Sequence, residues 1–167
     1  MFEKLRSIIF KLNPETAHNL AIKALKLNKI PNFSLDKSSQ KFLETKLFDI
    51  KIPNPIGVAA GFDKNAEVYN SLFNLNFGFV EVGTVTPLKQ YGNPKPRVFR
   101  LEEDEALINR LGFNNSGADI ISRYISDNKP KGLLGVNIGP NKDTKDRLND
   151  YSLCFKKFYN ICDYLTI

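Results

Sequence analysis

Apolar residues recur at three- and four-residue steps through the start of the chain, the spacing of one face of an amphipathic helix. Two stretches carry this pattern: Phe2, Leu5, Ile8, Ile9 and Leu12 form the first, and Ala17, Leu20, Ala21, Ala24 and Leu25 form the second. Between them, Asn13 can cap a helix and Pro14 suits its first position. The pattern predicts an amphipathic helical hairpin over residues 1–30. Pro, Asn and Ser are frequent in residues 31–41, which we expect to be a linker.

From residue 42 onward the pattern changes to an alternation of short apolar runs and helical stretches. Residues 43–52 alternate as an exposed strand pair does, and residues 99–101 and 106–108 resemble a small hairpin inside a long excursion. The remaining predicted strands are 56–60, 79–85, 133–138 and 164–167, and the predicted helices are 66–75, 117–126 and 148–162. Strands that alternate with helices indicate an α/β fold with a parallel sheet.

Four parallel strands are half of the eight in a (β/α)8 TIM barrel. We therefore expect residues 42–167 to form the first half of such a barrel, with the helical hairpin as an appendage. A closed barrel needs about 250 residues, and the chain has 167. The expectation is that this sequence is a fragment with two open sheet edges.

Composition narrows the function classes. The net charge is +6, but the lysines are scattered and few aromatic residues alternate with them, which favours a solvated basic surface over a nucleic-acid site. No apolar run approaches the about 20 residues of a membrane span, and no secretory signal is recognisable, so we expect a cytoplasmic chain. Cys154 and Cys162 are expected to be buried free thiols. The one histidine, His18, is not expected to be catalytic, and no metal-binding cluster is visible.

In a barrel, site residues follow the carboxyl ends of the strands. Directly after the strand 56–60 come Gly61 and, three residues later, Lys64. Small residues let a flat ring approach the backbone, and a cation can stabilise negative charge on a flavin or an anionic substrate. The alternative is an ordinary surface lysine.

Two further strand ends carry polar residues. Thr84 can offer a hydroxyl to a cofactor ring, although threonine is also simply a good strand former. Asn137 is expected to meet a cofactor or substrate, because an asparagine in a barrel lumen is costly unless it is paired; a backbone partner is the alternative. The excursion ends with Asn109, for which we favour ligand contact, whereas Asn114 or Asn115 can equally cap the following helix.

Five blocks, in order and spacing, closely resemble the class 2 dihydroorotate dehydrogenases, which are membrane-associated and reduce quinone. They are NPIGVAAGFDK (54–64), EVGTVTP (81–87), KPR (95–97), INRLGFNN (108–115) and GVNIG (135–139). The amphipathic hairpin before them adds to the resemblance. Composition and periodicity alone indicate no more than a flavin- or phosphate-binding barrel.

The resemblance implies oxidation of dihydroorotate to orotate in pyrimidine (UMP) synthesis, with FMN as cofactor and a membrane quinone as final acceptor. The hairpin would form the quinone tunnel and rest peripherally on the cytoplasmic face of the cell membrane. The flavin contacts that it implies are Ala60, Gly61, Phe62, Asp63, Lys64, Thr84 and Asn137. The implied substrate contacts are Lys64, Asn109, Arg110, Leu111, Gly112 and Phe113.

The resemblance places no catalytic residue in this chain. In this family the strand that begins at residues 164–167 continues into a segment whose serine is the general base. The base is therefore expected just beyond Ile167, and the chain is expected to be inactive alone. Three alternatives remain open: a non-catalytic half-barrel that binds flavin or a partner chain, the soluble class of the same activity, and a lipid-surface binding protein. The soluble class lacks the hairpin, which argues against it.

Overall fold

A computed structural model of the chain describes residues 6, 9–27, 36–47 and 49–167. Most of the first predicted helix, and residues 31–35 of the predicted linker, lie outside these ranges. The second predicted helix is present as α2 (Pro14–Lys26). The side chain of Asn13 accepts a hydrogen bond from the Glu15 N–H at 3.0 Å, so the predicted cap is confirmed. Leu25 is buried near the end of α2, whereas Leu20 is half exposed.

Part of the predicted linker is helical. Helix α3 (Lys37–Leu43) begins after Asp36, whose carboxylate accepts hydrogen bonds from the N–H groups of Ser38 and Ser39. The serines that suggested a linker are therefore the first turn of a capped helix. Beyond α3 the expected strand pair is confirmed as β1 (Thr45–Leu47) and β2 (Ile50–Ile52), which are antiparallel.

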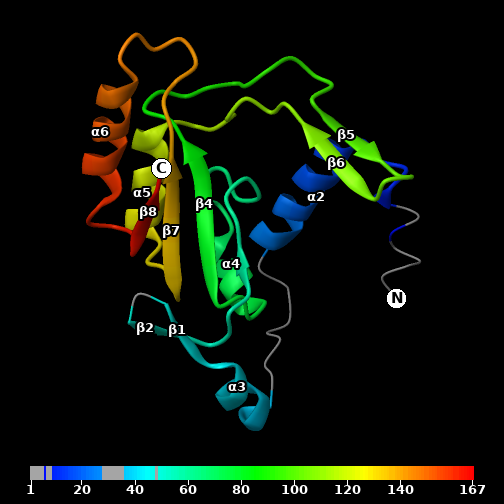
Figure 1. Cartoon of the computed structure of the whole chain (residues 1–167), viewed down its shortest axis with the longest axis vertical. Helices are drawn as coiled ribbons and strands as arrows, with labels where there is room; N and C mark the ends of the chain where they lie inside the picture. The colour runs from blue at the N-terminus through cyan, green and yellow to red at the C-terminus, as the bar shows by residue number, and fades with distance from the viewer. Residues whose placement is uncertain (1–5, 7–8, 28–35, 48) are drawn as a thin grey trace.

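The rest of the chain is the predicted half of a barrel (Figure 1). Its strands form one parallel sheet in the order β3 (Gly57–Val58), β4 (Phe79–Val85), β7 (Leu133–Ile138) and β8 (Tyr164–Thr166). The helices between them are α4 (Tyr69–Asn74), α5 (Ala118–Asp127) and α6 (Arg147–Phe158). Among the described residues the strands do not close into a barrel, and β3 and β8 are the outer strands.

The first helix of the barrel part is shorter than expected. The helix predicted over 66–75 begins only at Tyr69. The buried carboxylate of Asp63 accepts hydrogen bonds from the N–H groups of Glu67 and Val68, at 2.8 Å each, and so holds these residues outside the helix. Ala66 has φ +56°, which interrupts a helix. The loop after β3 is therefore a folded unit held by one side chain.

The last predicted helix and strand also end earlier than expected. The helix predicted over 148–162 ends at Phe158 in α6, and the strand predicted over 164–167 ends at Thr166 in β8. The prediction that Ile167 belongs to the strand is wrong. Strand β8 pairs with β7 only as far as Thr166, and the Ile167 side chain is 81% exposed.

The two faces of the sheet differ in what covers them. Apolar residues of α4, α5 and α6 pack on one face, where Val80, Val82 and Leu134 are fully buried. On the other face the ring of Phe79 lies against Gly57, and the ring of Tyr164 lies against Gly135. Large residues thus lie beside glycines on the face that corresponds to a barrel lumen.

A second small hairpin lies in the excursion between β4 and α5. It consists of β5 (Val98–Leu101) and β6 (Ala106–Asn109), as predicted, and α2 lies beside it in Figure 1. Cys154 is buried and Cys162 partly buried, and both are free thiols. No helix in the described ranges is long and apolar enough to cross a bilayer.

Candidate functional site

A cavity of about 370 Å³ lies at the carboxyl ends of the strands. We call it the carboxyl-face cavity. It is lined by Ala60, Gly61, Lys64, Gly83, Thr84, Asn109, Leu111, Gly112, Phe113 and Asn114. Most of the predicted flavin and substrate residues therefore meet in one space, although they come from three separate segments of the chain.

Lys64 brings a positive charge to this cavity. Its ammonium donates a hydrogen bond to the Gly61 carbonyl, within the same loop. Burial lowers the pKa of Lys64, and the charge of Arg97 lowers it further, while Glu15 opposes the shift. Among the described residues that line the carboxyl-face cavity, Lys64 is the one side chain with a titratable amine or carboxyl group. The alternative of an ordinary surface lysine does not fit this position.

The strand ends beside Lys64 are cross-linked. The Gly61 N–H donates to the Gly83 carbonyl at 2.8 Å, and the Gly83 N–H donates to the Asp63 carbonyl at 3.1 Å, which join the loop after β3 to β4. The hydroxyl of Thr84 donates to the side-chain oxygen of Asn137 on β7. Asn137 is outside the set that lines the cavity but is one contact away from it.

Three predicted contact residues point elsewhere. Asp63 is buried and holds backbone N–H groups, and Phe62 packs edge-on against His18 at 5.3 Å between ring centroids. Arg110 is exposed, and its guanidinium lies over the ring of Phe99 and donates to the Pro96 carbonyl. Sequence periodicity does not predict these contacts, because the carboxylate of Asp63 accepts N–H groups of its own loop, whereas Phe62 and Arg110 find partners in other segments.

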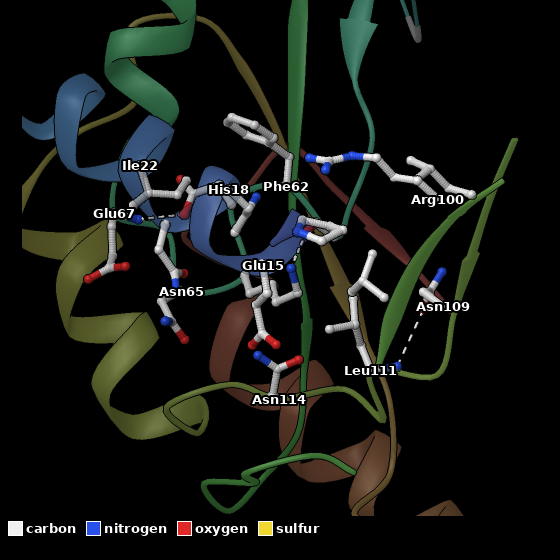
Figure 2. A pocket seen from close by; sticks show the side chains of 17 residues that line it. Glu15, His18, Ile22, Phe62, Asn65, Glu67, Arg100, Asn109, Leu111 and Asn114 are labelled. Atoms are coloured by element: carbon white, nitrogen blue, oxygen red, sulfur yellow. Dashed lines mark hydrogen bonds between the residues drawn. The ribbon is translucent and has the colours of Figure 1, made fainter. Parts of the chain in front are cut away.

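A second cavity, of about 380 Å³, lies between α2, the loop after β3 and the β5–β6 hairpin. We call it the helix-side cavity. Figure 2 shows Glu15, His18 and Ile22 of α2 facing Phe62 and Asn65 of the loop, with Arg100 and Asn109 from the hairpin. Its lining contains both apolar and charged groups, which suits a ligand with an apolar body and polar atoms.

The two cavities share a wall. Gly61, Lys64, Asn109, Leu111 and Asn114 line both of them. The side-chain oxygen of Asn114 is buried and has no hydrogen-bond partner, the one such side-chain atom found among the described residues. Asn115 is buried and its side chain accepts the Gly117 N–H, but the N-cap of α5 is Gly117 without a side-chain cap, so neither Asn114 nor Asn115 is its cap residue.

His18 has a depressed pKa at the helix-side cavity. Burial is the main cause, the nearby charge of Lys64 adds to it, and Glu15 opposes it. The folded state therefore binds fewer protons than the unfolded chain below about pH 6.5, the ordinary pKa of histidine. Stability contributed by His18 is complete above that pH and falls as the pH drops towards the folded pKa.

We expect NMR titration of the His18 ring protons to give a pKa below the ordinary value. In a Lys64→Met variant the pKa should rise, because a positive neighbour is lost, yet stay below the ordinary value, because the ring is still buried. A wild-type pKa at or above the ordinary value, or no change on removing Lys64, would contradict this arrangement.

The sequence of this chain matches a known protein family over most of its length. A family profile described as dihydroorotate dehydrogenase matches residues 42–167. The chain belongs to the dihydroorotate dehydrogenase family. Two relatives are named dihydroorotate dehydrogenase (quinone): that of Bartonella tribocorum is 51% identical over 164 residues, and that of Erythrobacter litoralis is 48% identical over 167 residues. They cover 97% and 99% of this chain.

Solved structures of this family have the same fold. The dihydroorotate dehydrogenase of Eimeria tenella in complex with ferulenol is 37% identical, with a TM-score of 0.82 over 95% of this chain. Its ligand-free form is 40% identical, with a TM-score of 0.83 over 91% of this chain. The half-barrel is thus part of a TIM-barrel family. The chain spans 44% and 48% of the two bacterial relatives and 46% and 44% of the two solved chains.

Several residues at the two cavities were not singled out from the sequence. Glu15 and Arg100 at the helix-side cavity, and Arg97 beside Glu15, are the main examples. Arg97 lies in the family block KPR and is buried, and a buried arginine requires a partner. Its partner Glu15 is 82 positions away, so no local pattern could pair them. Arg100 donates to the carbonyls of Phe10 and Leu12 before α2.

Proposed function

We propose that this chain supplies the flavin- and pyrimidine-binding face of a dihydroorotate dehydrogenase (quinone). The observation that supports this best is the wall shared by the two cavities. An electron donor in one cavity and an acceptor in the other would be separated by only a few side chains, as oxidation of one substrate and reduction of another at a single flavin require. The pathway would be pyrimidine synthesis, and the cofactor FMN.

The residues of the carboxyl-face cavity fit a flavin ring. Ala60, Gly61 and Gly83 give a flat wall without bulky side chains, and Thr84 with Asn137 offers polar atoms at its edge. Lys64 supplies a cation. Bound FMN would accept a hydride from dihydroorotate and later pass electrons to a quinone. The chain's own part is to bind and orient both molecules.

A pyrimidine carboxylate suits the opposite side of this cavity. The ammonium of Lys64 can pair with the carboxylate, while the amide of Asn109 can both donate to and accept from the ring. Leu111 and Phe113 add apolar surface, and Gly112 allows close approach. Lys64 would therefore serve the flavin and the substrate together.

The helix-side cavity is the proposed quinone site. Residues 1–30 would form a hairpin that packs through α2 on the barrel part, 42–167, and would rest peripherally on the cytoplasmic face of the cell membrane. The basic residues on α2, Lys23 and Lys26, lie in its last turn and are exposed. Basic, amphipathic helices of this kind bind anionic lipid surfaces.

Proton abstraction from dihydroorotate is the step that this chain does not supply in our proposal. The lining of the carboxyl-face cavity, as described, contains no carboxylate, histidine or cysteine, and Lys64 is assigned to binding. We place the base in a segment beyond Ile167, which itself lines neither cavity. A missing general base lowers a rate by roughly 10²- to 10⁴-fold. We therefore expect the 167-residue chain to bind ligands without appreciable turnover.

The test uses the purified chain with FMN. Flavin fluorescence should be quenched on binding, orotate should perturb the flavin absorbance, and dihydroorotate-dependent dye reduction should stay at background. Flavin binding without any effect of orotate would favour the non-catalytic half-barrel. Rapid dye reduction would overturn the proposed absence of a base, and failure to bind FMN would contradict the proposal itself.

A further inference from the structure

Helix α2 is fixed to the barrel at both ends by different contacts. At its carboxyl end, Lys26 pairs with Glu67 and the Leu25 carbonyl accepts the hydroxyl of Ser71 at 2.9 Å. At its amino end, Glu15 pairs with Arg97. The first set reaches α4 and the loop before it, whereas the second reaches the excursion that carries segment 109–112.

The Glu15–Arg97 pair is geometrically complete. Glu15 accepts from Arg97 at both carboxylate oxygens, with distances of 2.6 Å and 3.2 Å, and the side chains are 14% and 7% exposed. The remaining terminal nitrogen of Arg97 donates to the carbonyls of Tyr91 and Asn93. The hydrogen bond from Arg97 keeps the pKa of Glu15 below its ordinary value. A guanidinium buried this deeply needs such a partner.

From Arg97 the contacts lead directly to the substrate segment. The Arg97 carbonyl accepts the Arg110 N–H at 2.9 Å. Asn93 holds the same segment twice, because its N–H donates to the Leu111 carbonyl at 3.0 Å and its side chain donates to the Arg110 carbonyl at 2.7 Å. Gly112 packs tightly against Asn93, since an added Cβ would lie 3.0 Å from the backbone nitrogen of Asn93.

We infer that Glu15, although it belongs to the appended helix, is a positioning residue for the pyrimidine-binding segment 109–112 and acts through Arg97 and Asn93. This inference rests on the proposed function for the identity of the ligand. Without the carboxylate, Arg97 is a buried cation without its counter-ion and releases the 91–93 carbonyls. The hydrogen bonds that Asn93 and Arg97 make to segment 109–112 are then weakened.

The experiment compares Glu15→Gln with Lys26→Gln in the 167-residue chain supplied with FMN. Glu15→Gln removes the ion pairs of α2 with Arg97 and Lys95, whereas Lys26→Gln removes its pair with Glu67, and only the contact with Arg97 leads to segment 109–112. We expect Glu15→Gln to weaken orotate binding roughly tenfold, the scale on which mutations along a contact network act. Hydrogen exchange at the Arg110 and Asn93 amides should accelerate. Lys26→Gln should change neither quantity, because its partner Glu67 lies in the loop after β3 and not in the excursion that carries segment 109–112.

A double-mutant cycle separates this role from general stabilisation. Arg97→Lys should resemble Glu15→Gln, and the double variant should be no worse than either, because both act in one network. If Glu15→Gln does not fold by circular dichroism, Glu15→Asp, which keeps the charge on a shorter side chain, serves the same comparison.

The outcomes distinguish the two proposals. Orotate affinity and amide exchange in Glu15→Gln that equal those of the wild type would overturn the inference. Faster exchange in Glu15→Gln alone, in a chain that binds no orotate at all, would overturn the proposed ligand and leave the positioning of segment 109–112 by Glu15 intact.

Discussion

Replacing Gly83 with alanine is expected to destabilise the fold strongly. Gly83 has φ +110°, and an added Cβ would lie 2.4 Å from the Asn137 carbonyl oxygen and 3.0 Å from the Val85 nitrogen. Both neighbours are backbone atoms of paired strands and cannot turn aside. Backbone strain and overpacking each cost roughly 1–3 kcal/mol, so about 4 kcal/mol is expected. Urea unfolding followed by circular dichroism measures this.

Gly61→Ala is the matched control for this prediction. Gly61 also has a positive φ, +104°, but no atom lies within 4 Å of the position of its Cβ. This variant bears only the backbone strain and should lose roughly 1–3 kcal/mol. Equal losses in the two variants would show that contact with Asn137 does not decide the effect.

Replacing Lys64 with methionine is expected to have the largest effect on ligand binding. The ammonium is the cation that faces the proposed carboxylate, and loss of one partner of a buried charge pair costs several kcal/mol, which predicts a roughly 100-fold or greater loss of orotate affinity. Stability should change little, because methionine retains the apolar stem and avoids the desolvation of a buried charge. Flavin-detected orotate titration and thermal unfolding report the two quantities separately.

Lys46→Met provides the comparison. Lys46 is exposed on β1, and β1 lies at the end of the sheet opposite the carboxyl ends of β4 and β7 (Figure 1). This variant should bind orotate as the wild type does. A similar loss in both variants would mean that net charge, and not the position of Lys64, governs binding.

The strand and helix order of the barrel half could be predicted because each element has its own periodic pattern and few alternatives of similar energy. The start of α4 could not. It depends on Asp63, which the family resemblance implied as a flavin contact and whose carboxylate accepts hydrogen bonds from the N–H groups of Glu67 and Val68. A local hydrogen bond of this kind leaves no periodic signal.

The positions of some site residues could also be predicted from the sequence, and those of others could not. The place of Lys64 at the cavity was predictable, because strand ends in a parallel sheet converge on one edge, and that of Asn109, on the antiparallel β6, was predictable from the chemistry of its amide. The role of Glu15 was not, since its partner is distant in sequence and only the folded chain brings them together. The helix α3 was missed for a third reason, namely that serines after Asp36 are equally common in linkers and in capped first turns.

The shared wall has a thermodynamic consequence. Five residues line both the carboxyl-face cavity and the helix-side cavity: Gly61, Lys64, Asn109, Leu111 and Asn114. A ligand in one cavity that displaces any of these residues therefore changes the surroundings of a ligand in the other. The free, two singly bound and doubly bound states form a thermodynamic cycle. Because its free energies sum to zero, the factor by which the first ligand changes the dissociation constant of the second equals the factor in the reverse direction. Titrations in the two orders must therefore return one and the same coupling constant.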